Sequence, residues 1–333
     1  MRLDEFDYPL ADESIATVPA EPRDAARLLV DRGSQPPSHL RVRDLPGELR
    51  EGDLLVVNDT RVIPARLMVR RASGGAVEVL LLEPLDADQR VWECLVRPAR
   101  KLREGEDLHH GDEVVARVGP RRDDTATIEI VGDDPMATIV RIGETPLPPY
   151  LAGATAPPER YQTVYARTPG SAAAPTAGLH LTEELLAAIE AMGVGLARVE
   201  LVVGLDTFRP VTAEDPRAHT IHTERYTVAP EVLDRCRAAR RVVAVGTTSV
   251  RALESAASTG RLAGRTGLFI HRPYEWQVVD LLMTNFHMPR TTLLMMIDAF
   301  VGPRWRSLYE TARLEGYRFL SFGDAMLLDR RAA

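Results

Sequence analysis

The pattern of apolar and polar positions changes twice along the chain. Within residues 1–65, short apolar runs at 27–30 and 53–57 are typical of strands. Within residues 66–149, apolar and polar residues alternate with a period of two, and glycine-containing turns separate the runs. From 150 to 333, short apolar runs alternate with segments of helical spacing. The pattern therefore predicts two kinds of structure in three consecutive stretches.

The middle stretch is typical of a small antiparallel barrel or sandwich. Its alternating runs lie at 76–81, 92–96, 113–118 and 125–130, and no helical pattern separates them. We therefore expect an inserted β-barrel domain at 66–149. It would interrupt an α/β catalytic domain built from 1–65 and 150–333. The proline-rich segment 146–150 would form a stiff return connection.

The C-terminal stretch predicts helices and strands in alternation. Helices are expected from Thr182 to Gly193, from Pro230 to Arg240 and from Arg304 to Glu315, and strands at 194–203 and 242–246. This rhythm is typical of a mostly parallel sheet covered by helices.

The most informative stretch lies near the C-terminus. The apolar run 278–283 predicts a strand, the polar residues 284–287 a loop, and the spacing of 291–300 a buried helix that Pro289 would open. A loop at the carboxyl end of a strand is where α/β proteins place ligands. The alternative is a plain turn before a buried helix, with His287 bonded to the backbone.

Composition narrows the class of protein. A chain of 333 residues with 45% hydrophobic and 27% charged residues is typical of a soluble protein of two domains. No apolar run approaches the roughly 20 residues of a membrane span, and the first residues do not resemble a secretory signal. Two distant cysteines, Cys94 and Cys236, are expected to be free thiols in a reducing cytosol. We expect a cytoplasmic monomer that does not bind a membrane.

The net charge of −7 does not favour a nucleic-acid binder. Cationic residues nevertheless cluster at Arg66, Arg70 and Arg71, and again at Arg97, Arg100, Lys101 and Arg103. The planar guanidinium group of arginine suits phosphate. A local basic face and an ordinary solvated surface are both open.

The sharpest local signal is a glycine between a strand and a helix. The strand runs through Gly246 into Thr247, Thr248 and Ser249, which would open the helix. Unpaired N–H groups and the positive end of the helix dipole make such a terminus an anion site, for a carboxylate or a phosphate. The alternative is a helix cap with more hydroxyls than it needs.

Three further segments carry polar groups. The loop 173–182 contains small residues that let a backbone approach a ligand, and it ends beside His180. His219, His222 and Glu224 permit zinc only weakly, so proton transfer or hydrogen bonding is the favoured interpretation. The turn 58–61 predicts either an Asx turn or a ligand loop.

Several blocks of sequence together resemble one enzyme family. They are DEFDYPL at 4–10, GDLLVVNDTRVIPARL at 52–67, PTAGLH at 175–180, GTTSVRALE at 246–254, TNFH at 284–287 and GDAM at 323–326. The chain resembles S-adenosylmethionine:tRNA ribosyltransferase-isomerase, the enzyme of queuosine biosynthesis that makes epoxyqueuosine. The resemblance spans essentially the full length, and it implies an α/β domain that carries an inserted β-barrel.

The resemblance also implies the chemistry. S-adenosylmethionine would be the co-substrate and ribosyl donor, tRNA the acceptor, and no metal would be needed. A base removes an acidified C5′ proton, the aminomethyl group of 7-aminomethyl-7-deazaguanine attacks the ribose, and adenine and methionine leave as an epoxycyclopentane forms. Such chemistry needs a base, a donor that helps adenine depart, and an anion site for the methionine carboxylate.

Candidate residues follow from the resemblance and from the local signals. The catalytic candidates are His180, His219, His222, Glu224 and His287. The candidates for binding S-adenosylmethionine are Thr176, Gly178, Gly246, Thr247, Thr248, Ser249, Asn285 and Phe286. The candidates for binding the acceptor are Asn58, Asp59, Thr60, Arg61 and Arg251.

Some positions depart from the family pattern. Val202 replaces a histidine, Asp206 a glycine and Gly267 an aspartate, and Arg272-Pro273 replaces a Pro-Gly pair. Val202 cannot transfer a proton, and Asp206 adds a charge where the backbone usually approaches closely. Two alternatives therefore stay open, which are a family member with a non-tRNA small-molecule acceptor and a catalytically silent nucleoside- or RNA-binding protein.

Overall fold

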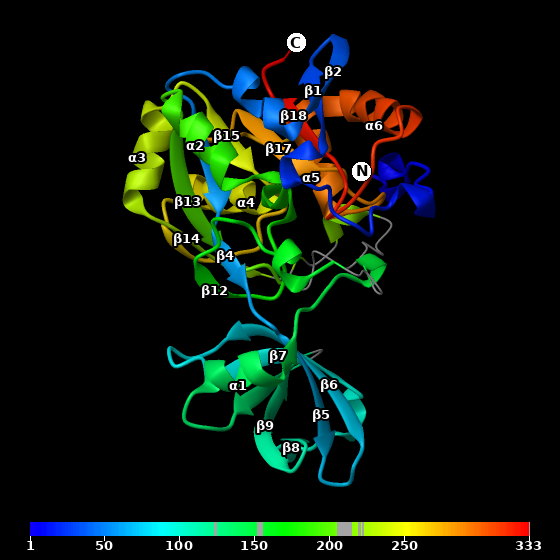
Figure 1. The fold of residues 1–333 in the computed structure, drawn as a ribbon, viewed down its shortest axis with the longest axis vertical. Helices are drawn as coiled ribbons and strands as arrows, with labels where there is room; N and C mark the ends of the chain where they lie inside the picture. The colour runs from blue at the N-terminus through cyan, green and yellow to red at the C-terminus, as the bar shows by residue number, and fades with distance from the viewer. Residues whose placement is uncertain (123–124, 152–155, 205–214, 219–220, 222, 333) are drawn as a thin grey trace.

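The protein, seen here as a computed structural model, has two bodies of different architecture (Figure 1). A large sheet with helices forms one body, and a β-barrel forms the other. The structure describes residues 1–122, 125–151, 156–204, 215–218, 221 and 223–332. None of the helices in these ranges has both the length and the apolar composition that a membrane span requires.

The large sheet is mixed. Its strands are β1 (Arg27–Arg32), β2 (Gln35–Arg41), β3 (Leu54–Asn58), β13 (Gly195–Leu201), β14 (Glu224–Val228), β15 (Val242–Val245), β16 (Ala263–Thr266), β17 (Leu281–Asn285) and β18 (Ala325–Asp329), in the order β16-β14-β13-β3-β15-β17-β18-β1-β2. The central strands β13, β3, β15 and β17 are parallel, and β14, β16 and β2 pair antiparallel at the flanks. Strand β18 runs antiparallel to β17 and parallel to β1. The α/β class predicted from the sequence is confirmed.

Helices bury both faces of this sheet. They are α2 (Glu183–Ala191), α3 (Pro230–Ala238), α4 (Thr247–Thr259), α5 (Thr292–Val301) and α6 (Trp305–Leu314). Alternate residues of β15 enter different cores, since Ala244 packs with α4 and α5 whereas Val243 packs with α2. All of β15 is buried, which explains why its sequence is a continuous apolar run.

The predicted β-barrel is also present. Its strands are β5 (Arg66–Arg71), β6 (Ala76–Pro84), β7 (Val91–Arg97), β8 (Asp107–His110), β9 (Glu113–Arg122) and β10 (Thr125–Ile130), in the order β5-β6-β7-β10-β9-β8, and pairing of β5 with β8 closes the barrel. These strands lie inside the predicted insert 66–149. Strand β11 (Gly143–Glu144) pairs with β5 where the chain leaves the barrel.

The barrel domain also contains a short helix that the sequence pattern did not predict. Helix α1 (Pro135–Ile142) follows the last long strand of the barrel. The Asp134 carboxylate accepts a hydrogen bond from the N–H of Ala137 at 2.9 Å, and Ile139 and Ile142 add to the barrel core. Eight residues give only two turns, which is too short for a clear helical pattern in sequence.

Short elements complete the chain. Strands β4 (Thr60–Val62) and β12 (Thr168–Ser171) form a small parallel pair. The 3-10 helices are Leu3–Phe6, Asp12–Ser14, Arg23–Ala25, Val42–Glu48, Ala99–Lys101, Pro149–Leu151, Pro158–Tyr161, Thr176–His180, Pro216–Ala218 and Gly302–Arg304.

The stretch near the C-terminus forms strand, loop and helix as predicted, with one correction. Strand β17 continues through Thr284 and Asn285, and helix α5 begins after Thr291, whose hydroxyl accepts from the N–H of Leu294. Pro289 therefore does not open the helix. Arg290, between the proline and the cap, has a left-handed φ of 57°, which no helix can contain.

The chain runs from the end of β3 through β4 into β5, so the carboxyl ends of the parallel strands face the barrel (Figure 1). One ion pair joins the two bodies directly at this edge. The guanidinium group of Arg265 on β16 contacts both carboxylate oxygens of Glu83 on β6, at 2.6 Å each. It also donates to the hydroxyl of Thr223 at 2.7 Å.

Candidate active site

A cavity of about 340 Å³ lies at the carboxyl edge of the large sheet. Four segments that are far apart in sequence contribute to its wall, together with two tyrosines. The wall includes Ala174, Pro175, Thr176 and Ala177, then Gly246, Thr247 and Thr248, then Thr284 to Pro289, then Leu320 and Ser321, with Tyr150 and Tyr161. The cavity lies where α/β folds bind ligands.

The turn between β15 and α4 is the predicted anion site. Gly246 adopts a φ of 85°, a conformation that disfavours any side chain, and α4 then begins at Thr247. The hydroxyl of Thr248 is buried in the cavity wall and has no hydrogen-bond partner among the described residues. Ser249 differs, because its hydroxyl donates to the carbonyl of Val245 at 2.7 Å and it does not line the cavity.

Asn285, at the end of β17, connects two other candidates. Its side-chain amide lies 3.0 Å from Nε2 of His180 and 3.0 Å from the carbonyl oxygen of Leu320, so it donates to both. Its Oδ1 accepts from the hydroxyl of Thr176 at 3.5 Å. Asn285 and Thr176 line the cavity, whereas His180 lies behind them and does not. His180 therefore orients Asn285.

His287 lines the cavity from the loop after β17. Its Nδ1 lies 2.7 Å from the carbonyl oxygen of Asn285, so Nδ1 carries the proton and Nε2 keeps a lone pair. The hydroxyl of Thr284 lies 3.4 Å from that Nε2. Burial lowers the pKa of His287 to about 4, so the ring is neutral at neutral pH and can accept a proton.

The pKa of His180 is also lowered to about 4, first by burial and then by the charges of Arg318 and Arg23. Both buried histidines are therefore neutral imidazoles at neutral pH. Only His287 borders the cavity, so it is the stronger candidate for a base among the described histidines.

The cavity has an aromatic side. Phe286 is buried in the wall, and its ring centroid lies 5.4 Å from that of Tyr309 and 4.9 Å from that of Phe319. Tyr309 lies on helix α6, and its hydroxyl accepts a hydrogen bond from the N–H of His287 at 3.1 Å. The aromatic cluster thus fixes the loop that carries His287.

Gly178 has a packing role. A methyl group at this position would lie 1.8 Å from the hydroxyl oxygen of Tyr165, so the space beside Gly178 is already filled. Gly178 does not line the cavity. The glycine lets the loop pack against Tyr165 rather than leaving room for a ligand.

Sequence reasoning missed several residues of the cavity wall. The hydroxyls of Tyr150 and Ser321 lie 2.6 Å apart and both residues line the cavity. Leu320 adopts a left-handed φ of 68° while its carbonyl accepts from Asn285. Such a conformation costs a non-glycine residue about 1–3 kcal/mol and is enriched at functional sites. The only signal in the sequence was that 320–321 precede the block 323–326.

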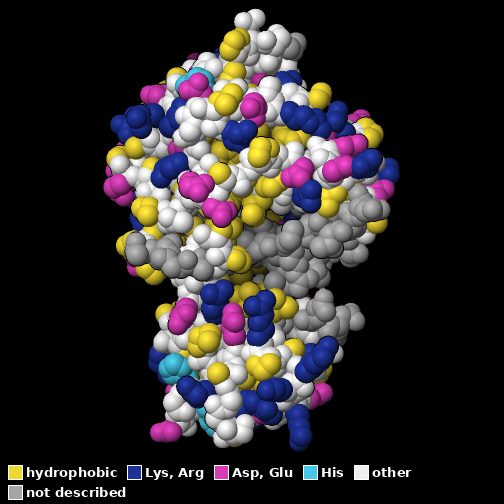
Figure 2. Space-filling view, turned by 90° about the vertical axis from the view of Figure 1, so that its right-hand side faces the viewer, with side chains coloured by type: hydrophobic (Ala, Val, Ile, Leu, Met, Phe, Trp, Pro, Cys, Tyr) yellow, Lys and Arg dark blue, Asp and Glu magenta, His cyan; other side chains and the backbone are white. Residues whose placement is uncertain are grey.

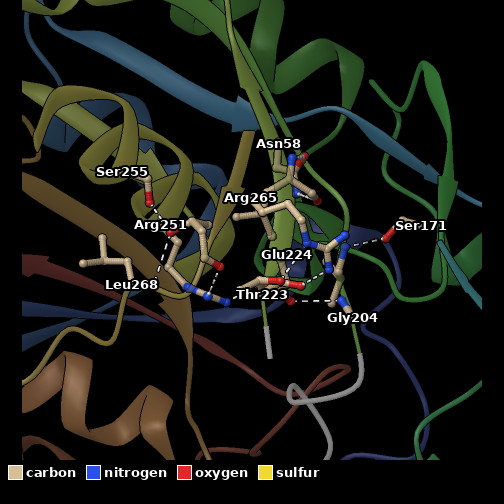
Figure 3. A network of polar contacts seen from close by, with 12 residues as sticks. Asn58, Ser171, Gly204, Thr223, Glu224, Arg251, Ser255, Arg265 and Leu268 are labelled. Atoms are coloured by element: carbon tan, nitrogen blue, oxygen red, sulfur yellow. Dashed lines mark hydrogen bonds and ion pairs between the residues drawn. The ribbon is translucent and has the colours of Figure 1, made fainter. Parts of the chain in front are cut away.

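Glu224 and Arg251 form a separate cluster (Figure 3). Arg251 makes an ion pair with the buried carboxylate of Glu224, which also accepts from the N–H of Gly204 at 2.9 Å. Glu224 lines a different cavity, of about 210 Å³, together with Val202 and Arg265. The structure therefore brings Glu224 and Arg251 together but places neither in the wall of the larger cavity.

The residues of the turn 58–61 are largely used within the fold. Asn58 donates to the carbonyl of Leu201 at 3.0 Å and accepts from its N–H at 3.1 Å, which joins the ends of β3 and β13. Thr60 donates to the same carbonyl at 3.5 Å. Burial, followed by the charge of Glu200, raises the pKa of Asp59.

Arg61 is the exposed member of this turn. It lines a cavity of about 330 Å³ on the far side of Tyr161, together with Arg23. Tyr161 borders both this cavity and the larger one.

Several predicted positions lie outside the described residues, namely His219, His222 and Asp206. Among the described residues, no group of three or more His, Cys, Asp or Glu side chains could hold a metal ion. Val202 is buried, and its N–H donates to the carbonyl of Arg225 at 2.9 Å. Gly267 is exposed just after β16. Cys94 and Cys236 are buried free thiols, as expected.

The fold and the site together define a class. This is an α/β protein with an inserted barrel, whose cavity combines the N-terminus of helix α4, a neutral histidine and an aromatic wall. Those features suit an enzyme that acts on a small ligand with an anionic end.

Comparison with known proteins identifies the family within this class. The model of a family described as queuosine biosynthesis protein matches residues 3–328, and the chain belongs to that family. The family resemblance read from the sequence is therefore confirmed.

Relatives share the full length of the chain. The S-adenosylmethionine:tRNA ribosyltransferase-isomerase of Symbiobacterium thermophilum is 49% identical over 98% of this chain and 100% of its own length. The enzyme of the same name from Rubrobacter xylanophilus is 50% identical and covers 98% of both chains. The crystal structure of the S-adenosylmethionine tRNA ribosyltransferase from Thermotoga maritima is 38% identical, with a TM-score of 0.56 over 97% of this chain and 99% of that one.

Proposed function

We propose that this protein is an S-adenosylmethionine:tRNA ribosyltransferase-isomerase of queuosine biosynthesis. It transfers and isomerises the ribosyl group of S-adenosylmethionine onto 7-aminomethyl-7-deazaguanine in tRNA, releases adenine and methionine, and yields epoxyqueuosine. Full-length similarity to enzymes of that name supports the activity. The observation that carries the site is the buried hydroxyl of Thr248, at a helix N-terminus in the wall of the cavity of about 340 Å³.

The anion site holds the methionine carboxylate in this proposal. The carboxylate accepts hydrogen bonds from the N–H groups that open α4 and from the hydroxyls of Thr247 and Thr248. Ser249 serves the fold, since its hydroxyl is bonded to Val245. The aromatic and apolar wall around Phe286 excludes water from the bound ligand.

His287 is the proposed base. Nε2 accepts a proton while Nδ1–H remains bonded to the carbonyl of Asn285, which holds the ring in one tautomer and orientation. Asn285 is fixed by His180 and Leu320, so His180 is a positioning residue that acts through Asn285. Tyr150 and Ser321, joined by a hydrogen bond, are the proposed donors toward departing adenine.

The acceptor is tested with the isolated protein, S-adenosylmethionine and tRNA that bears the 7-aminomethyl-7-deazaguanine precursor. Release of adenine that depends on this tRNA, with epoxyqueuosine in the recovered RNA, is the expected result. Adenine release without tRNA would instead favour a small-molecule acceptor, which the replacement at Val202 motivates. Binding of S-adenosylmethionine without any release would indicate a catalytically silent protein.

A further inference from the structure

A second cavity continues from the proposed active site along the outside of the barrel. It measures about 220 Å³ and lies between the outer faces of β5, β6 and β7 and the return segment 146–149. Pro149 borders both this cavity and the active-site cavity. The two cavities therefore adjoin at Pro149.

The second cavity has an apolar floor, and the unpaired guanidinium group of Arg97 lies beside it. Leu80, Leu82 and Leu95 form part of the floor. Leu80 and Leu95 alternate with residues of the same strands that fill the barrel core, and Leu80 packs against that core from the side. Arg66, Glu78 and Arg97 line the same cavity. Glu78 makes an ion pair with Arg66 at 3.3 Å, whereas no ion pair of Arg97 is found among the described residues. An apolar floor with guanidinium groups beside it matches the two parts of a nucleotide, a flat base and a charged phosphate.

More cations follow Arg97 along the chain. Arg97, Arg100 and Lys101 are exposed, and no carboxylate among the described residues makes an ion pair with any of them. Arg121 joins them, because its guanidinium group donates to the carbonyl of Ala99 at 2.8 Å. Lys and Arg side chains also gather on the barrel body in the space-filling view (Figure 2).

Other arginines of the barrel are neutralised. Arg71 pairs with Glu106 at 2.6 Å, Arg117 with Asp107 at 2.8 Å, and Arg141 with Glu113 at 2.8 Å. The contrast is informative in a protein with a net charge of −7, which has carboxylates available to pair. Cations that are left unpaired beside a cavity keep their full charge for a ligand.

From this geometry we propose an RNA-docking surface on the barrel, formed by the second cavity and by Arg97, Arg100 and Lys101. The nucleotides that flank the modified base lie over Leu80, Leu82 and Leu95. Their phosphates contact the three cations. This proposal rests on the proposed function, since it assigns a position to the tRNA that the active site modifies. The barrel thereby holds the RNA backbone while the target base enters the larger cavity.

The test compares two double variants of the full chain. Arg97→Gln with Lys101→Gln removes two unpaired cations and keeps a polar side chain at each position. The matched control, Arg117→Gln with Arg141→Gln, removes two barrel cations that already have carboxylate partners. Binding of precursor-bearing tRNA is measured over a series of salt concentrations, and adenine release is measured over a series of tRNA and S-adenosylmethionine concentrations.

We expect the first variant to bind tRNA about 10- to 30-fold more weakly near 0.1 M salt. The slope of log K against log salt concentration should become smaller in magnitude by about 1 to 1.5. Each of the two lost phosphate contacts accounts for about 0.7 of a released counterion. The KM for tRNA should rise, with kcat at saturating tRNA and the KM for S-adenosylmethionine unchanged. The control should retain the affinity and the salt slope of the parent protein.

Two failures are distinguishable. If the parent protein turns over tRNA and both variants behave alike, the docking surface is wrong and the proposed function stands. A lower kcat with unchanged tRNA affinity would also overturn the docking surface. If the parent protein releases no adenine with tRNA, the proposed function fails, and with it the surface that depends on it.

Discussion

Replacing Thr248 by valine tests the anion site most directly. Valine has nearly the same shape as threonine, so the substitution removes one hydroxyl and leaves the packing of α4 in place. The hydroxyl is buried and lacks a hydrogen-bond partner in the part of the chain that the structure describes. Its removal therefore breaks no hydrogen bond in the described part of the ligand-free protein, and the stability of that form should stay the same or rise slightly.

The cost should appear only when the ligand is bound. A hydrogen bond to a charged group contributes about 1.5–3 kcal/mol, and the N–H groups of α4 remain to hold the carboxylate, so we expect a loss of about 1–2 kcal/mol. This corresponds to an affinity for S-adenosylmethionine about 5- to 30-fold weaker. The shift in melting temperature that saturating ligand produces should shrink accordingly.

Ser249→Ala is the matched control. Its hydroxyl donates to Val245 inside the fold, so its loss should lower stability by about 1 kcal/mol and leave ligand affinity unchanged. Calorimetric titration with S-adenosylmethionine measures the affinities, and thermal unfolding without ligand measures the stabilities. Unchanged affinity in Thr248→Val, or an equal loss in both variants, would refute the assignment of Thr248 to the carboxylate.

Further predictions concern the histidines and the sheet. His287→Gln should lower kcat by about 10²- to 10⁴-fold while S-adenosylmethionine still binds. Stopped assays of adenine release measure kcat, and calorimetry measures binding. An unchanged kcat would exclude His287 as the base. The pH–kcat profile should show no dependence on His287 between about pH 6 and 8, because the pKa of His287 is lowered to about 4; an inflection near pH 6.5 that disappears in His287→Gln would contradict this. The free energy of unfolding should decrease as the pH is lowered from about 6.5 to about 4, because the unfolded chain binds protons there that buried His180 and His287 do not. The loss should reach up to about 1.4 kcal/mol per pH unit for each histidine. Denaturant unfolding at several pH values measures it, and an equally large loss in the double variant His180→Asn with His287→Gln would argue against this cause. Asn58→Leu should lower the free energy of unfolding by about 2–4 kcal/mol, because the N–H and the carbonyl of Leu201 both lose their hydrogen bond to Asn58. The affinity for S-adenosylmethionine should change little. A stability loss below about 1 kcal/mol would show that these two hydrogen bonds contribute little.

Local sequence carried much of the fold. The fully apolar run of β15 predicted a buried strand, because burial on both faces imposes that composition. Gly246 and the hydroxyl residues after it predicted the start of the helix that follows. Period-two alternation predicted the barrel, because a closed sheet presents every second residue to its core. The short helix α1 was missed, since its two turns follow no long periodic pattern.

Local sequence could also mark the anion site. Glycine before three hydroxyl residues predicted a helix terminus able to bind an anion, and Thr248 borders the cavity. The pattern could not distinguish Thr248 from Ser249. The difference arises because α4 rotates neighbouring residues by about 100°, so one hydroxyl faces the cavity and the next faces β15.

Sequence by itself determined the family, the fold class and the chemical character of each loop. Tertiary structure alone decided which loops meet. It joined Asn285 to His180, placed His287 at the cavity, and separated Glu224 and Arg251 into another cluster. The physical reason is that a site at the edge of a parallel sheet draws its walls from strands distant in sequence. Their proximity depends on strand order and packing, which no local pattern encodes.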